Sequence, residues 1–177
     1  MLKIDPRSST LLVIDFQTRL MPAIDQGADV VANAKRLIDA AAIIGVPALF
    51  TEQNANGLGP TVPELAPDLP IVAHKMTFDA CCTAGFLERL AANHALVVAG
   101  CEAHVCVLQT VLGLIGHGRK ALVVRDALGS RSAENKETAI RRMERCGAQV
   151  VTTEMVVFEW LETAEHPRFR EAISLIK

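Results

Sequence analysis

The chain carries six short apolar runs, and the segments between them are long enough to hold helices. The runs are LLVI (11–14), PALF (47–50), IVA (71–73), LVVA (96–99), LVV (122–124) and QVV (149–151). Short runs rich in leucine and β-branched residues are typical of strands buried on both faces of a sheet. Their alternation with helix-sized segments predicts a parallel βα arrangement.

The segments between the runs repeat apolar residues at helical spacing. The clearest of them are residues 30–41, 105–115 and 133–146. Gly45, Gly116 and Gly147 follow these segments, as glycine often follows a helix C-terminus, and Ser132 is a suitable N-cap for the third. We therefore expect a three-layer α/β/α sandwich, with a single domain over residues 1–177.

One stretch interrupts this alternation. NANGLGPTVPELAPDLP (54–70) contains four prolines and two glycines, so it predicts a long loop without a helix. Two interpretations stay open for it. The loop is either a surface segment that covers an edge of the sheet, or a rim or lid over a site, because long ordered loops often carry function.

Composition limits the partners of the protein. Its 177 residues include 18 lysines and arginines against 20 aspartates and glutamates, which gives a formal net charge of −2. A chain without a broad basic field is not expected to bind nucleic acid or an anionic membrane. The opening MLKIDPRSSTLLVID has too short an apolar core for a signal peptide, which favours a cytoplasmic location.

The five cysteines do not suggest a disulfide framework, because their number is odd and Cys81 and Cys82 are adjacent. Reduced thiols are expected, most of them buried as small apolar side chains. AGCEAHVCVLQT (99–110) needs a separate interpretation, since it sets Cys101 and Cys106 around His104 directly after an apolar run.

Cys101, His104 and Cys106 do not suit a metal site. Cys101 ends a buried strand, while His104 and Cys106 stand two positions apart on a predicted helix, so their side chains diverge by roughly 200°. The same divergence argues against His104 as the base for Cys106. Neither a thioredoxin-like Cys-x-x-Cys nor a phosphate-binding glycine motif is present. Cys106 remains as a candidate thiol nucleophile.

Three polar residues stand at the carboxyl ends of predicted strands, where ligands bind in open parallel sheets. Asp15 follows the first strand, Lys75 follows the third, and Cys106 lies in the first turn of the helix after the fourth. Asp15 alone is equally well explained as an N-cap or an ion-pair partner. Together, a helix N-terminus and a nearby ammonium lower a thiol pKa, so we expect a reactive thiolate at Cys106.

LLVIDFQ, HKMTF and GCEAHVCVLQT, in this order and spacing, resemble the three catalytic segments of the isochorismatase-like cysteine hydrolases. Asp15, Lys75 and Cys106 fall on the Asp-Lys-Cys triad of that family. TEQNANGLGPTVPEL, DALGSRS and HPRFREAISLIK extend the resemblance over nearly the whole chain. It implies a Rossmann-like fold with a six-stranded parallel sheet, a tendency to form homo-oligomers, and a cis peptide bond between Cys101 and Glu102.

Two departures from related families narrow the activity that this resemblance implies. Nicotinamidases of the superfamily hold a metal through an aspartate and histidines after the second strand, where this chain has TEQNANGLGP without histidine. We therefore expect no metal and no cofactor. Isochorismatases proper cleave a vinyl ether and lack the cysteine nucleophile, whereas this chain keeps Cys106, which favours a carbon–nitrogen bond as the bond cleaved.

The resemblance implies hydrolysis of a small-molecule amide through a thioester. Asp15 takes the thiol proton, Lys75 holds the carboxylate and stabilises the thiolate, and Cys106 attacks the carbonyl carbon. The backbone N–H groups of Glu102 and Cys106 are the expected donors to the oxyanion.

Phe16 and Gln17 follow the expected base and are candidate substrate-binding residues. The alternatives are core packing for Phe16 and a hydrogen bond to a loop for Gln17. Two other functions also stay open. The chain is either a scaffold or regulatory protein that kept the fold, or a thiol redox sensor in which Cys106 pairs with Cys101.

Overall fold

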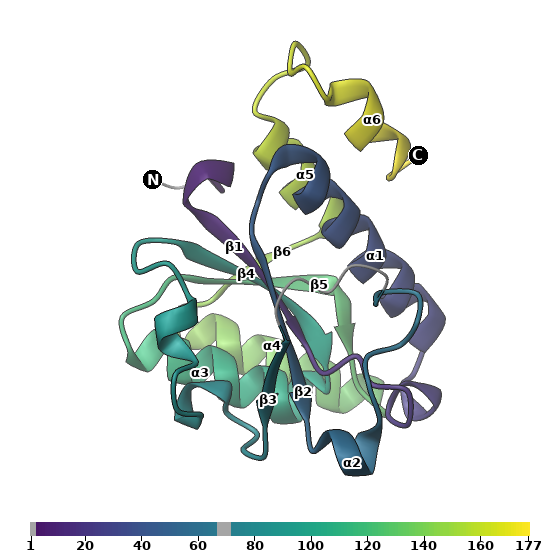
Figure 1. Cartoon of the computed structure of the whole chain (residues 1–177), viewed down its shortest axis with the longest axis vertical. Coiled ribbons are helices and arrows are strands. Elements are labelled where there is room, and N and C mark those ends of the chain that lie inside the picture. The colour runs from purple at the N-terminus through teal and green to yellow at the C-terminus, as the bar shows by residue number, and fades with distance from the viewer. Residues whose placement is uncertain (1–2, 67–71) are drawn as a thin grey trace.

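The computed structural model describes residues 3–66 and 72–177, and its centre is a six-stranded sheet (Figure 1). The strands are β1 (Ser9–Ile14), β2 (Ala48–Gln53), β3 (Val72–Lys75), β4 (Ala95–Cys101), β5 (Ala121–Gly129) and β6 (Gln149–Val151). Their order across the sheet is β3-β2-β1-β4-β5-β6, and all neighbouring strands run parallel. The predicted α/β class with a parallel sheet is confirmed.

Helices cover both faces of this sheet (Figure 1). One face carries α1 (Gly27–Ile44), α5 (Thr153–Leu161) and α6 (Phe169–Ser174), and the other carries α3 (Leu108–Gly116) and α4 (Ala133–Arg145). Buried side chains of β1 alternate between the two cores: Leu11 and Val13 belong to the first, and Leu12 and Ile14 to the second. The strands are buried on both faces, which explains their continuous apolar runs.

The boundaries of α1 and α4 agree with the predicted signals, whereas Gly116 is the last residue of α3 rather than the residue after it. The residue after α1 is Gly45, whose φ of 89° is a left-handed conformation that glycine adopts without steric cost. The Ser132 hydroxyl accepts a hydrogen bond from the backbone N–H of Asn135 at 3.4 Å and so caps α4. Short 3-10 helices lie at Pro6–Ser8, Met21–Ala23, Ala80–Cys82 and Leu87–Arg89.

Some local features differ from the expectation. Ala55–Leu58 forms a single helical turn, α2, inside the stretch predicted to hold no helix, because the prolines of that stretch begin only at Pro60. A π-helical segment, Ala103–Val107, precedes α3, so the candidate nucleophile does not lie in the first turn of an α-helix. The pattern also misses α5, whose almost continuous apolar sequence has no helical periodicity.

The described part of the proline-rich loop is fastened beside the end of β1. The backbone N–H of Thr18 donates to the Pro60 carbonyl at 2.9 Å, and that of Val62 donates to the Phe16 carbonyl at 2.8 Å. These bonds fix the loop next to the residues that follow β1. Residues 67–70 of the predicted loop lie outside the described part of the chain.

The strand order reverses between β1 and β4, and this reversal locates the candidate site. From β1 the chain adds β2 and β3 on one side, and it then returns to place β4 on the other side of β1. Such a switch point opens a crevice at the carboxyl ends of the two strands. Among residues 3–66 and 72–177, no helix is both long enough and apolar enough to cross a membrane.

Candidate active site

Asp15 directly follows β1 and carries a buried carboxylate. Its φ of 53° lies in the left-handed region, which aspartate tolerates better than most residues. The side chain is only 1% exposed. Its Oδ2 accepts a hydrogen bond from Lys75 Nζ at 2.7 Å, and its Oδ1 accepts one from Thr51 Oγ1 at 2.6 Å. Both carboxylate oxygens are therefore held by protein donors.

Lys75 is the last residue of β3, and its ammonium completes a buried ion pair. Besides the Asp15 carboxylate, Nζ donates to the Thr77 carbonyl at 3.2 Å and to the Phe78 carbonyl at 3.4 Å. Three acceptors match the three N–H donors of an ammonium. These hydrogen bonds replace the hydration that the ammonium loses on burial.

The Cys106 thiol is buried, and the charges of the Asp15 and Lys75 side chains both act on it. Burial raises the pKa of Cys106 to about 12, the Asp15 carboxylate adds to that increase, and the Lys75 ammonium opposes it. This direction is opposite to the lowered pKa that a helix N-terminus and a nearby ammonium predicted. At neutral pH the thiol keeps its proton, so an attack by sulfur needs a base at the moment of reaction.

The peptide bond between Cys101 and Glu102 is cis, as the family resemblance implied. The Glu102 carboxylate accepts hydrogen bonds from the backbone N–H of Arg131 at 2.9 Å and from its Nε at 3.0 Å. The Glu102 carbonyl accepts from the backbone N–H of Val107 at 3.2 Å. Glu102 is thus held through both its side-chain carboxylate and its backbone carbonyl. The oxyanion role of the Glu102 and Cys106 N–H groups stays a prediction.

Phe16 and Gln17 lie next to Asp15 and are buried. Phe16 packs in the core beneath α1. The Gln17 amide donates to the carbonyls of Gln53 at 3.1 Å and Gly59 at 2.6 Å, and its oxygen accepts from the Gln53 N–H at 2.9 Å. These contacts are the ones expected if Phe16 serves in core packing and Gln17 in a hydrogen bond to a loop. Substrate binding by Phe16 and Gln17 stays a prediction.

Cys101 and His104 are not drawn into the cluster around Cys106. Burial raises the pKa of Cys101, which belongs to the core on the α1 face of the sheet, whereas Cys106 belongs to the core on the other face. His104 Nδ1 lies 3.1 Å from the Ser130 hydroxyl. Within residues 3–66 and 72–177, no three histidine, cysteine or acidic side chains are grouped as metal ligands. That the protein works without metal stays a prediction.

Two residues of β2 that the sequence did not single out support this region. Thr51 bonds to the Asp15 carboxylate, and the buried Glu52 accepts hydrogen bonds from the backbone N–H of Thr61 at 2.7 Å and from its hydroxyl at 2.8 Å. The only sequence signal was their position, since TEQ directly follows an apolar run. A hollow of about 330 Å³ adjoins the site and is lined by Asn54, Ala55, Asn56, His74, Lys75 and Met76.

Comparison with known sequences identifies one family. Residues 9–155 match the model of the isochorismatase domain. An isochorismatase domain-containing protein 2 of Danio rerio is 33% identical over 98% of this chain and 89% of its own length. An isochorismatase domain-containing protein 1 of the same species is 34% identical over 98% of this chain, which spans only 62% of that relative.

Solved structures have the same fold. A structure from Caenorhabditis elegans, described as MAR1 ribonuclease, has a TM-score of 0.93 and 35% identity over 98% of this chain and 92% of its own. YcaC of Pseudomonas aeruginosa, solved with covalent acrylamide, has a TM-score of 0.90 and 25% identity, over 98% of this chain and 91% of its own. The YcaC product of Escherichia coli is described as an octameric hydrolase of unknown specificity. It has a TM-score of 0.87 and 27% identity, over 99% of this chain and 88% of its own.

Proposed function

Because the chain belongs to the isochorismatase family, we propose that it is a cysteine hydrolase that cleaves a carbon–nitrogen bond of a small amide. The observation that carries the proposal is the buried pair of Lys75 Nζ and Asp15 Oδ2, 2.7 Å apart, beside the Cys106 thiol. The covalent acrylamide in the structure of P. aeruginosa YcaC supports it, since acrylamide is an electrophile that carries an amide.

The first step is a proton transfer coupled to attack. Asp15 accepts the proton of the Cys106 thiol, and the sulfur forms a bond to the carbonyl carbon as the C=O electron pair moves onto oxygen. Lys75 holds the carboxylate and stabilises the negative charge that develops on sulfur. The raised pKa of Cys106 makes Asp15 necessary at this step, because little thiolate exists at neutral pH.

The tetrahedral intermediate then collapses to a thioester. The backbone N–H groups of Glu102 and Cys106 are proposed to bind the oxyanion, and removing one such donor typically costs about 2.7–4 kcal/mol of transition-state stabilisation. The carbon–nitrogen bond breaks as Asp15 returns its proton to the leaving nitrogen. Water next attacks the thioester, Asp15 accepts a proton from it, and the carbon–sulfur bond breaks. The carboxylic acid leaves and Cys106 regains its proton.

The name of the C. elegans structure raises a different substrate class, RNA. A formal net charge of −2 argues against it for this chain, because neutralising phosphates requires a basic surface. We propose instead that the substrate is a small molecule. We also propose that the protein is a homo-oligomer, which the octamer of the E. coli relative supports, and that it acts in the cytoplasm. We propose no cofactor.

The test is a screen of small primary amides and ureido acids for ammonia release. The wild type is compared with Cys106→Ala, which lacks the nucleophile, and with Cys146→Ala, which removes an exposed thiol at the end of α4. We expect release from at least one compound by the wild type and by Cys146→Ala, and none by Cys106→Ala. Mass spectrometry after alkylation with iodoacetamide at pH 9 checks whether the peptide that contains Cys106 is labelled.

Other outcomes favour the two alternatives. If the folded wild type hydrolyses no amide of the screen, the scaffold or regulatory protein is favoured. If mild peroxide joins Cys101 to Cys106, visible by non-reducing mass spectrometry, the redox sensor is favoured. Turnover by folded Cys106→Ala would overturn the proposal outright.

A further inference from the structure

Thr51, on β2, contacts the candidate base twice. Its carbonyl accepts a hydrogen bond from the Asp15 backbone N–H at 3.2 Å, and its hydroxyl donates to Asp15 Oδ1 at 2.6 Å. Resting on the proposed function, we propose that Thr51 is a positioning residue, which holds the Asp15 carboxylate in the orientation that exchanges a proton with Cys106.

The backbone contact fixes where Asp15 turns away from β1. Its φ of 53° ends the regular alternation of the strand and directs the side chain away from the position that a continuing strand would give it. The bond to the Thr51 carbonyl ties this turned residue to the neighbouring strand. The carboxylate still rotates about its own side-chain bonds, so a second contact is needed to orient it.

The hydroxyl contact supplies that orientation. Lys75 binds Oδ2, and a single point of attachment leaves a carboxylate free to pivot about it. Thr51 binds the other oxygen, so the plane of the carboxylate is defined by two donors from two strands. Each carboxylate oxygen has two acceptor sites, so one site on each oxygen remains for the proton of Cys106.

Burial makes this hydroxyl hard to replace. Thr51 and Asp15 are each 1% exposed, so bulk water has little access to the position of the missing donor. In such a low-dielectric site a hydrogen bond is stronger than in water, and an unmade one is costly. Loss of the hydroxyl is therefore expected to release the carboxylate from its orientation rather than to let water take over the contact.

The experiment compares Thr51→Val, which keeps the shape and removes the hydroxyl, with Thr51→Ser, which keeps the hydroxyl. Thr10→Val is the matched control, because Thr10 is a buried threonine of β1 whose hydroxyl pairs with His94 Nδ1 at 2.9 Å. Thr51→Ala is a second variant in case valine disturbs the sheet. Circular dichroism and thermal melting establish folding for each protein.

Turnover of an amide from the screen is the first readout. We expect kcat of Thr51→Val to fall about 10- to 100-fold with KM within about threefold of the wild type, the scale of a misplaced catalytic group. Thr51→Ser should recover kcat to within about threefold of the wild type, since the donor is restored. Thr10→Val should match the wild type. A packing defect would not be rescued by serine in this way.

Alkylation of Cys106 by iodoacetamide at pH 9 is the second readout and needs no substrate. The Asp15 carboxylate raises the pKa of Cys106, so a carboxylate that turns away leaves more thiolate. Thr51→Val should therefore be alkylated faster than the wild type, in the direction of Asp15→Asn, and Thr51→Ser should not. Normal kcat, an unchanged alkylation rate, or equal loss in the serine variant each overturns the inference.

The same measurements separate this inference from the proposed function. If Asp15→Asn turns over normally, the proposed base is wrong. If Asp15→Asn is inactive and folded Thr51→Val behaves as the wild type, only the role of Thr51 is wrong.

Discussion

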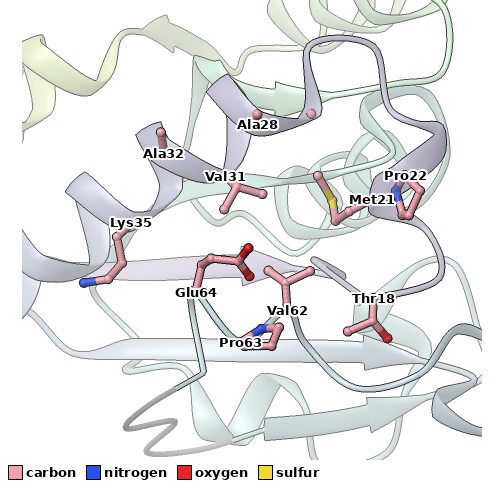
Figure 2. A pocket seen from close by; sticks show the side chains of 11 residues that line it. Thr18, Met21, Pro22, Ala28, Val31, Ala32, Lys35, Val62, Pro63 and Glu64 are labelled. Atoms are coloured by element: carbon pink, nitrogen blue, oxygen red, sulfur yellow. The ribbon is translucent and has the colours of Figure 1, made fainter.

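Two regions of the molecule look like sites, and they differ in size and in chemistry. A hollow of about 670 Å³ lies between α1 and residues 62–64, and Figure 2 shows Val31 of α1 and the side chains of Met21 and Val62 along its walls. The region around Cys106 has a hollow of only about 330 Å³ beside Lys75. The larger hollow is apolar, whereas the smaller one adjoins a buried ion pair and a thiol.

The two regions also differ in the role of their charged side chains. In the apolar hollow, Lys35 is partly exposed and paired with Asp39 one helical turn away, an arrangement that stabilises a helix surface by a few tenths of a kcal/mol at most. Near Cys106, the Asp15 and Lys75 side chains are each 1% exposed, and their charges act on the pKa of the Cys106 thiol in opposite directions. Convergence of buried titratable groups indicates a reactive site better than volume does, and for this reason we place the proposed chemistry at Cys106.

Among the substitutions that test this difference between the two regions, Asp15→Asn has the largest expected effect on turnover. The amide keeps the shape but cannot exchange the proton, so turnover should fall about 100-fold or more, the scale of a lost general acid–base. The pKa of Cys106 should fall at the same time, because a negative charge that raises it is gone. Iodoacetamide should therefore react faster with Cys106 between pH 7 and 10 while amide hydrolysis nearly stops.

Glu52→Gln is the matched control, since Glu52 is also a buried carboxylate on an adjacent strand that accepts hydrogen bonds from Thr61. It should keep turnover within about threefold, as a group outside the proton transfer. Breaking a buried ion pair typically costs about 3–5 kcal/mol, so melting curves accompany the kinetics of Asp15→Asn. Turnover of the folded variant within a few-fold of the wild type would show that Asp15 is not the base.

Lys75→Met should also reduce turnover strongly, but it should change the pKa of the Cys106 thiol in the opposite direction. The ammonium lowers the pKa of Cys106, so its removal raises that pKa above the value of about 12 in the wild type. At any pH below that value less thiolate is present, and alkylation should slow by roughly tenfold for each unit of increase. The rate of iodoacetamide labelling against pH measures this shift.

Lys136→Met provides the control for the loss of a lysine charge. Lys136 lies on α4, and burial lowers its pKa, but it is not among the groups that act on Cys106. Labelling of Cys106 should be unchanged in this variant. If Asp15→Asn and Lys75→Met shift the labelling profile in the same direction, the three groups do not form one electrostatic unit.

The sequence predicted the meeting of Asp15, Lys75 and Cys106 because parallel strands bring their carboxyl ends to one edge of the sheet. It did not predict Thr51, since a threonine at the end of a strand has no distinguishing pattern, and the predicted apolar run ends at Phe50, before the polar end of β2. It also gave the wrong direction for the pKa of Cys106. Sequence spacing shows which groups are near a thiol, but not how far it is buried.

The smallest expected effect comes from filling the apolar hollow. Ala32 of α1 lines it (Figure 2) and is exposed, so Ala32→Leu places a large apolar side chain there with little cost in helix propensity. If chemistry and substrate binding both occur at Cys106, kcat and KM should stay within about twofold, and stability within about 0.5 kcal/mol, as for most surface substitutions.

Ala42→Leu is the control for this last prediction, because Ala42 is exposed on the same helix and does not line the hollow. The two variants should be indistinguishable in steady-state kinetics and in melting temperature. A rise in KM of about tenfold or more in Ala32→Leu alone, with kcat unchanged, has a specific meaning, since it is the signature of lost ground-state binding. It would show that the apolar hollow receives part of the substrate, and that the two regions act as one site.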